Sequence, residues 1–149
     1  MISFYTTRFF PYRPRCSNMK TKVLHQSIVF AVSPHELYDA FMDSKKHSSF
    51  TGAKATIGKH VGDQFSTWDN WATGTTLELV PDKKIVQQWR GADWPEGHYS
   101  EITIEFKKEG HNTRLDFTQT GIPESLYEDI AQGWQEWYWE KLHEYFTNK

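Results

Sequence analysis

The chain has 149 residues, enough for one domain with a substantial buried core, and 16% of them are aromatic, including seven Trp. Its net charge of −2 is unevenly placed. The first 22 positions hold five basic and no acidic residues, and the remaining 12 basic and 19 acidic residues argue against non-specific nucleic-acid binding. The single Cys16 excludes an internal disulfide, and no apolar run reaches the roughly 18 residues of a membrane-spanning helix.

Residues 1–18 are predicted to form a leader outside the folded domain, which then spans residues 19–149. The leader has three Arg, no acidic residue, and no apolar segment of the kind found in a secretory signal. We expect it to be disordered or non-native, in which case Met19 is the native start. Because targeting segments are Arg-rich and acid-poor, organellar targeting is an alternative, although two Pro residues argue against a long amphipathic helix.

The folded part begins with an apolar run at residues 22–32, which predicts the first strand. A helix start follows, with Ser33 as N-cap, Pro34 in the first turn and Glu36 completing a capping box. A second short helix is expected to end at Gly52.

Alternation of apolar and polar residues predicts further short strands, separated by residues typical of turns. These strands are expected at residues 53–57, 62–68, 71–80, 84–90, 98–107 and 112–120. A Gly-Ile-Pro turn at residues 121–123 then marks the change from a period of two to a period near 3.6. It predicts one long helix over about residues 123–147, with Ser125 and Glu128 as a capping box.

This order predicts an α+β fold, with a curved antiparallel sheet of six or seven strands around the long C-terminal helix and two short helices after the first strand. A curved sheet that grips one helix leaves room for a cavity between them. The residues assigned by alternation to the inner face of the sheet are Phe65, Thr67, Thr75, Leu77, Leu79, Ile85, Gln87, Trp89, His98, Ser100, Ile102, Ile104, Phe106, Thr113, Leu115, Phe117 and Gln119.

The C-terminal helix carries one broad apolar face. Its members are Leu126, Ile130, Trp134, Trp137, Tyr138, Leu142 and Tyr145. At about 100° per residue, Trp139 and Phe146 fall well away from that face. Either the sheet or a loop covers them, or they form an exposed aromatic pair that contacts a partner.

The loop before the strand at residues 98–107 is a second candidate for partner binding. Trp94 and Glu96 stand in a Trp-Pro-Glu-Gly segment, whose Pro and Gly stiffen and turn the backbone. A rigid aromatic residue at a loop tip makes a good anchor for a partner. The alternative is that Trp94 folds back over Tyr99 or the end of the helix and shields the core.

Nothing in the chain predicts an enzyme, a metal or a cofactor. The seven His are scattered without the i, i+4 spacing of a helical metal pair, and neither a phosphate-binding Gly-rich loop nor a nucleophile elbow is present. His98 and Gln119 are polar residues on strand faces that are otherwise apolar. They either orient a ligand in the cavity or satisfy each other and the backbone.

A set of motifs runs along the second half of the chain: Trp89-Arg90, Trp94-Pro95-Glu96-Gly97-His98-Tyr99-Ser100, Gln119-Thr120-Gly121-Ile122-Pro123, and Gly133-Trp134 followed by Tyr138, Trp139 and Phe146. With these motifs, the chain resembles the activator-of-heat-shock-protein-90-ATPase family over about residues 22–146. The resemblance is to the C-terminal domain of that family, within the START-like (SRPBCC, helix-grip) superfamily. The Trp-Pro-x-Gly-His-Tyr-Ser segment is fairly specific to the co-chaperone branch.

The resemblance implies a helix-grip fold and a cytoplasmic co-chaperone that binds the heat-shock protein 90 chaperone and modulates its ATPase. The eukaryotic activators carry a separate N-terminal domain that is not found in this sequence, so strong ATPase stimulation is not expected and weaker chaperone binding is left. The alternative is a START-like carrier or sensor of an apolar small molecule, and an enzyme on this fold is a third class.

Two sets of site residues follow from these interpretations. The predicted partner-binding residues are Trp94, Glu96, Trp139 and Phe146. The predicted residues of the ligand cavity are Phe65, Trp89, His98, Ser100, Phe117, Gln119, Trp134 and Tyr138.

Overall fold

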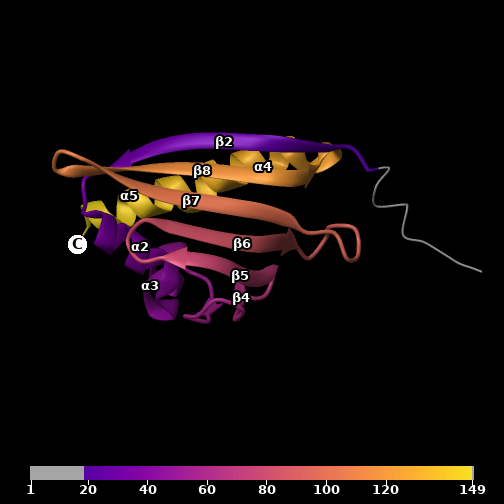
Figure 1. Ribbon diagram of the computed structural model, residues 1–149, viewed down its shortest axis with the longest axis horizontal. Helices are drawn as coiled ribbons and strands as arrows, with labels where there is room; N and C mark the ends of the chain where they lie inside the picture. Colours follow the sequence, from indigo (N-terminus) through magenta and orange to yellow (C-terminus); the bar gives the residue numbers. More distant parts are fainter. Residues whose placement is uncertain (1–18, 149) are drawn as a thin grey trace, which may run out of the picture.

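The computed structural model describes residues 19–148, and the predicted leader lies outside this range. One antiparallel sheet curves along the C-terminal helix, which crosses its inner face (Figure 1). In spatial order the seven strands are β2 (Thr21–Phe30), β8 (Asn112–Pro123), β7 (Ser100–Glu109), β6 (Lys84–Gly91), β5 (Ala72–Val80), β4 (Gln64–Thr67) and β3 (Thr56–Ile57). The predicted α+β fold is therefore confirmed.

Two short helices, α2 (Pro34–Met42) and α3 (Ser44–Thr51), follow β2 and lie beside the C-terminal end of the long helix (Figure 1). The predicted capping box is present, since Ser33 Oγ accepts from the Glu36 amide at 3.2 Å and Glu36 Oε1 accepts from the Ser33 amide at 3.2 Å. Helix α3 ends at Gly52, whose φ of 79° is readily adopted only by glycine. Both helix predictions are confirmed.

The C-terminal helix is continuous in space but changes its hydrogen-bonding pattern along its length. A 3-10 turn, η2 (Glu124–Leu126), leads into α4 (Tyr127–Trp134). A π-helical segment, η3 (Gln135–Trp139), then separates α4 from α5 (Glu140–Thr147). One long helix was correctly predicted, but its π-helical segment was not.

Two details at the start of this helix were predicted wrongly. No side-chain cap bonds the first turn of η2 or of α4, so the capping box of Ser125 and Glu128 is absent. The Gly-Ile-Pro segment is not a turn but the end of β8, where Pro123 pairs with Thr21 of β2. Strand β8 continues because β2 extends far enough to pair with it, which local turn propensity does not reveal.

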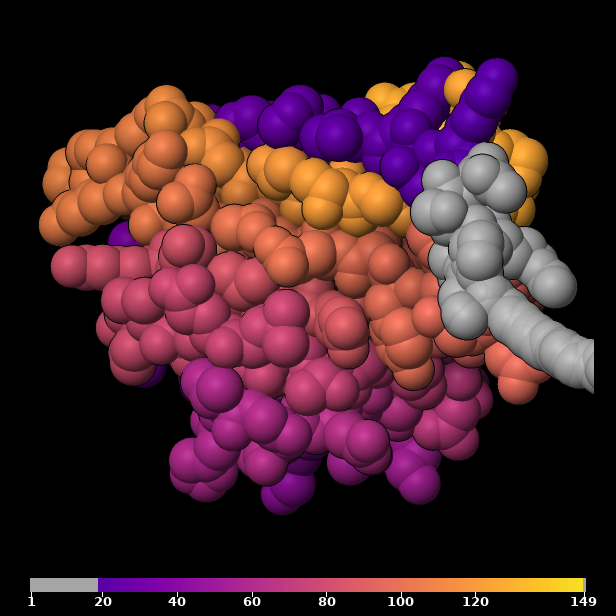
Figure 2. Space-filling model, turned by 45° about the vertical axis from the view of Figure 1, so that its right-hand side comes forward, coloured from indigo at the N-terminus to yellow at the C-terminus, as the bar shows by residue number. Residues whose placement is uncertain are grey.

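The core lies between the helix and the inner face of the sheet. Alternation predicted the inward residues of β4, β6, β7 and β8 correctly. It failed on β5, where Thr76 is buried and Leu77 is 41% exposed. A β-bulge at Leu77 shifts the register between Thr76 and Glu78, so Thr75 and Leu77 belong to the opposite face while Leu79 returns to the core. Figure 2 shows the strands as adjacent bands on the face away from the helix.

Candidate functional site: an aromatic cleft

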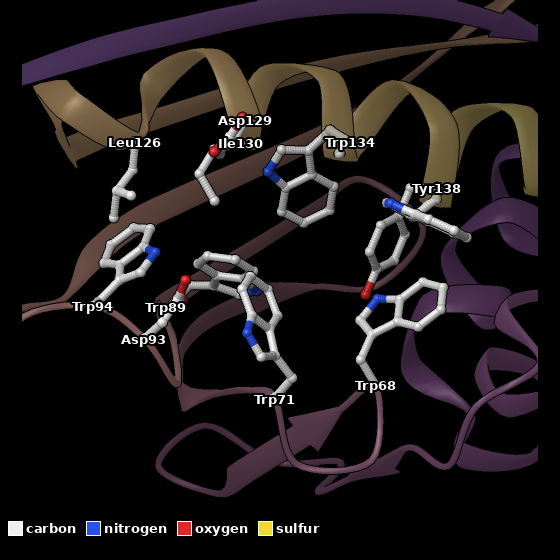
Figure 3. Close-up of a pocket in the computed structure, with 12 residues that line it drawn as sticks. Trp68, Trp71, Trp89, Asp93, Trp94, Leu126, Asp129, Ile130, Trp134 and Tyr138 are labelled. Carbon is white, nitrogen blue, oxygen red and sulfur yellow. The ribbon is translucent and has the colours of Figure 1, made fainter.

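An open cleft of about 390 Å³ lies between the first half of the C-terminal helix and the ends of β4, β5 and β6 (Figure 3). Side chains from the helix point towards side chains from the sheet and its loops. Six of the seven Trp line the cleft. The lining residues are Trp68, Trp71, Trp89, Asp93, Trp94, Leu126, Asp129, Ile130, Gly133, Trp134, Trp137 and Tyr138.

The turn between β4 and β5 brings two of these Trp to the cleft. Trp68, Asp69 and Asn70 all have positive φ angles, of 55°, 54° and 76°. Such a backbone is unusual for a bulky residue and costs on the order of 1–3 kcal/mol at each position. It turns Trp68 towards the helix, where its ring centroid lies 5.8 Å from that of Trp137. Backbone strain is thus concentrated at the wall of the cleft.

The loop after β6 is held against the domain by Arg90. Its Nη2 donates to the carbonyl oxygens of Trp94 at 2.7 Å and Pro95 at 3.3 Å, and its Nε donates to the His98 carbonyl at 3.3 Å. His98 Nε2 in turn donates to the Gly121 carbonyl at 2.7 Å. His98 is therefore engaged by the backbone, which is the alternative that the sequence analysis gave for it, and its place among the cavity residues stays a prediction.

Trp94 is 4% exposed, so the prediction that it forms an exposed anchor is wrong. The alternative prediction, that it folds back, is confirmed. Its ring packs edge-on against Trp89 at 5.4 Å, and Figure 3 shows it below Leu126 at the start of the helix. It covers the core and lines one end of the cleft, while Tyr99 is left exposed.

A chain of buried hydrogen bonds crosses from the helix to the sheet behind the cleft. Trp134 Nε1 donates to Gln119 Oε1 at 2.8 Å, and Gln119 Nε2 donates to Ser100 Oγ at 2.9 Å. Ser100 Oγ then donates to the Trp89 carbonyl at 2.8 Å. Gln119 and Ser100 are thus satisfied by their neighbours, and a role for either residue in ligand binding stays a prediction.

Tyr138 is fixed at the other end of the cleft by a buried His. The Phe41 carbonyl lies 3.1 Å from His47 Nδ1 and can only accept, so Nδ1 carries the proton and Nε2 accepts from the Tyr138 hydroxyl at 3.0 Å. Burial lowers the pKa of His47 to about 4, although the Phe41 carbonyl opposes this change, and burial raises the pKa of Tyr138 to about 12. Both groups are neutral at pH 7, so the pair orients Tyr138 and carries no charge.

The π-helical segment decides which aromatic residues of the helix reach the core. The amide of Glu140 bonds the Gln135 carbonyl five residues back, which turns the following residues by less than 100° each. Trp139 is therefore 1% exposed and Trp137 is 52% exposed, the reverse of the order expected from a regular α-helix. The prediction that Trp139 is exposed for a partner is wrong.

Gln26 of β2 completes this arrangement. Its Oε1 accepts from Trp139 Nε1 at 2.6 Å, and its Nε2 donates to the carbonyl of Ala131 at 3.1 Å. One side chain thus joins the edge strand to both halves of the helix.

The remaining predicted partner residues are distributed differently. Phe146 is half-buried and packs edge-on against Phe30, with the ring centroids 6.5 Å apart, so it does not form an exposed pair with Trp139. Glu96 is exposed in the loop after β6. The role of these two residues in binding a partner stays a prediction.

Three of the eight predicted cavity residues line the cleft, namely Trp89, Trp134 and Tyr138. Phe65 and Phe117 are buried core residues outside it. The sequence did not indicate that Trp68, Trp71 and Trp137 line the cleft. Trp68 and Trp71 flank the Asp-Asn pair that was correctly predicted to form a turn.

Within residues 19–148, no cluster of three His, Cys, Asp or Glu side chains has the arrangement needed to hold a metal ion. None of the helices in the same range has the length and apolar character needed to span a membrane. What the arrangement offers is a binding surface made of aromatic rings and two carboxylates.

Comparison with protein families gives a match over residues 31–147 to the family described as "Activator of Hsp90 ATPase homolog 1-like protein". The human "Activator of 90 kDa heat shock protein ATPase homolog 1" is 38% identical over 117 residues, which are 78% of this chain and 35% of the human protein. The Dictyostelium discoideum homologue is 35% identical over 77% of this chain and 30% of its own length. The chain thus spans about a third of the length of these relatives, whose names describe activators rather than catalysts.

Solved structures agree with the fold. An HSP90 activator from Plasmodium falciparum is similar with a TM-score of 0.80 and 25% identity, over 84% of this chain and 96% of that one. The Aha1 dimer from Colwellia psychrerythraea is similar with a TM-score of 0.65 and 19% identity, over 76% and 88% of the two chains. The second similarity supports the fold alone.

Proposed function

The chain belongs to the activator of Hsp90 ATPase homolog 1-like family, and on this basis we propose that it binds the 90 kDa heat-shock protein and modulates its ATPase activity. The proposal includes a cytoplasmic location, where a co-chaperone of this kind would meet its partner. We propose no catalytic activity for the chain itself.

One observation carries the proposal: 38% identity over 117 residues to a human protein named as an activator of this ATPase. The match covers 78% of the chain, so it includes most of the sheet and the C-terminal helix rather than one motif. The similarity to the Plasmodium falciparum HSP90 activator covers 96% of that chain. Because the match covers only 35% of the human relative's length, the extent of ATPase stimulation by this domain is part of the proposal.

Titration of the purified full chain into purified Hsp90, followed by calorimetry or by surface binding, tests the proposed partner. We expect a dissociation constant in the micromolar range and a rise in the ATPase rate that a specific Hsp90 inhibitor abolishes. Absence of binding at a concentration of several hundred micromolar, with or without ATP, would remove Hsp90 as a partner.

A surface variant tests where the partner binds. Glu96 is exposed and makes no ion pair within residues 19–148, so Glu96→Lys should leave the fold intact. If the loop after β6 faces the partner, this charge reversal should weaken binding about three- to tenfold. Glu101→Lys, a charge reversal at another exposed Glu on β7, is the matched control and should leave the affinity unchanged.

The aromatic cleft favours a second candidate function, the binding of a small molecule. Its volume of about 390 Å³ lies within the range of roughly 300–1,000 Å³ that is typical of ligand sites. Mass spectrometry of an organic extract of the purified protein, with the extract of an unrelated protein as the control, tests whether a molecule is carried through purification.

A further inference from the structure

We propose that the aromatic cleft binds a small organic cation, an amine or quaternary ammonium group attached to an apolar or aromatic body. This inference rests on the second candidate function and assigns a chemical class to its ligand. It is independent of Hsp90 binding.

The walls of the cleft are suited to a cation because they present several indole rings to one space. The ring centroids of Trp71 and Trp89 are 5.8 Å apart, those of Trp89 and Trp134 are 5.6 Å apart, and those of Trp68 and Trp137 are 5.8 Å apart. Trp has the most favourable ring face for a positive charge, and an ammonium group within about 6 Å of a ring centroid is attracted to it.

The cleft is open to solvent at this aromatic wall. Trp71 is 39% exposed and Trp137 is 52% exposed, although both are among the largest apolar side chains. Figure 3 shows Trp71 and Trp68 separated along the lower side of the cleft, opposite the helix. A ligand can therefore reach the rings of Trp71 and Trp137 directly, whereas Trp89 and Trp134 line the cleft with only 4% of each residue exposed.

The charged residues that line the cleft also favour a cation. Asp93 and Asp129 are its only charged lining residues, and within residues 19–148 neither carboxylate has an ion-pair partner within 4.0 Å. Among residues 19–148, no Lys or Arg lines the cleft. An unpaired carboxylate beside an indole wall attracts a cation and disfavours an anion.

One cation–ring contact is already present beside the cleft. Lys141 Nζ lies 5.5 Å from the centroid of the Trp137 ring. The Trp137 ring therefore already attracts an ammonium group of the chain itself, and a ligand cation is expected over the other indole rings of the cleft.

The volume of the cleft limits the size of the ligand. About 390 Å³ is near the lower end of the range for small-molecule sites, so a single ring bearing an ammonium group fits better than a large lipid. The expected ligand is thus compact, amphipathic and positively charged.

Two probes of nearly the same shape separate charge from hydrophobicity: (4-hydroxyphenyl)trimethylammonium and 4-tert-butylphenol. Each is titrated into the full chain at low salt while the indole N–H signals of the Trp residues are followed by NMR. We expect the cation to bind about tenfold more tightly than the neutral compound and to shift the signals of the six cleft Trp. The signal of Trp139, which lies outside the cleft and bonds Gln26, serves as the internal control.

Variants test the two carboxylates. The double variant Asp93→Asn with Asp129→Asn should weaken binding of the cation about fivefold and leave the affinity of the neutral probe unchanged. Glu128→Gln removes one negative charge from the neighbouring helix position, which does not line the cleft, and should have no effect. Gly133→Leu, which adds a side chain at the lining of the cleft, should weaken binding of both probes.

The possible outcomes differ in what they overturn. Equal affinities for the two probes would overturn the cation proposal and leave the small-molecule function standing. No binding of either probe would overturn both. Shifts of the cleft signals on dilution without any probe would mean that a second copy of the chain occupies the cleft, and the proposal would again be overturned.

Discussion

The hydrogen bond between Trp134 and Gln119 offers the sharpest test of how the helix is held on the sheet. Trp134 is 4% exposed, and its only polar atom donates to Gln119 Oε1 at 2.8 Å. We consider Trp134→Phe, which removes the donor, Gln119→Leu, which removes the acceptor, and the double variant, which removes both.

The structure predicts that the two single changes are costly and not additive. In Trp134→Phe, the buried oxygen of Gln119 loses its partner, which costs about 1–3 kcal/mol beyond the loss of packing. In Gln119→Leu, the indole N–H is the group left without a partner. The double variant removes both buried polar groups, so its loss of stability should be smaller than the sum of the single losses by about 1–2 kcal/mol.

The truncation Trp134→Ala sets the scale of the packing contribution. The Trp134 ring packs against Phe117 and Tyr138, with centroids 4.5 Å away in both cases. Loss of this side chain should cost about 3–5 kcal/mol, as found for large-to-small changes in other cores.

Urea unfolding at pH 7, followed by circular dichroism, gives the free energy of unfolding of each variant. Equal slopes with denaturant concentration would show that the unfolded states are comparable. The reasoning would be refuted if the double variant lost the sum of the single losses to within about 0.5 kcal/mol, or if Trp134→Ala cost less than about 1 kcal/mol.

Three further predictions follow from individual contacts. The pKa of His47 falls from 6.5 to about 4 on folding, so the unfolded chain binds a proton at a higher pH than the folded chain does. The free energy of unfolding should therefore be retained above pH 6.5 and decrease by about 3 kcal/mol as the pH falls to 4. Denaturant titrations of His47→Gln should lack this decrease. A Cβ atom at Gly74 would lie 1.7 Å from the Gln88 carbonyl oxygen, so Gly74→Ala should cost more than about 3 kcal/mol of stability. Gly133→Ala in the helix should instead stabilise the fold by about 0.5–1 kcal/mol. Thermal melts that rank the two variants in the opposite order would contradict the geometry. Arg90→Met should release the loop after β6 and cost about 1.5–3 kcal/mol, and unchanged hydrogen exchange in that loop would show that the guanidinium does not hold it.

The sequence by itself determined the elements whose signals are local. The Ser33 to Glu36 capping box, the end of α3 at Gly52 and the alternation along β7 and β8 each depend on neighbouring residues alone, and all were predicted correctly. The change of period near residue 121 also established the order of sheet and helix. Family membership followed from motifs that can be identified in the chain without coordinates.

Only the tertiary structure decided which aromatic residues face the core and which face the cleft. A single π-helical segment exchanges the positions of Trp137 and Trp139, because an extra residue in one turn changes the direction of the side chains within it. A bulge at Leu77 does the same on β5. The π-helical segment is favoured by contacts with a distant residue, Gln26, and these contacts form only when the sheet and helix have come together.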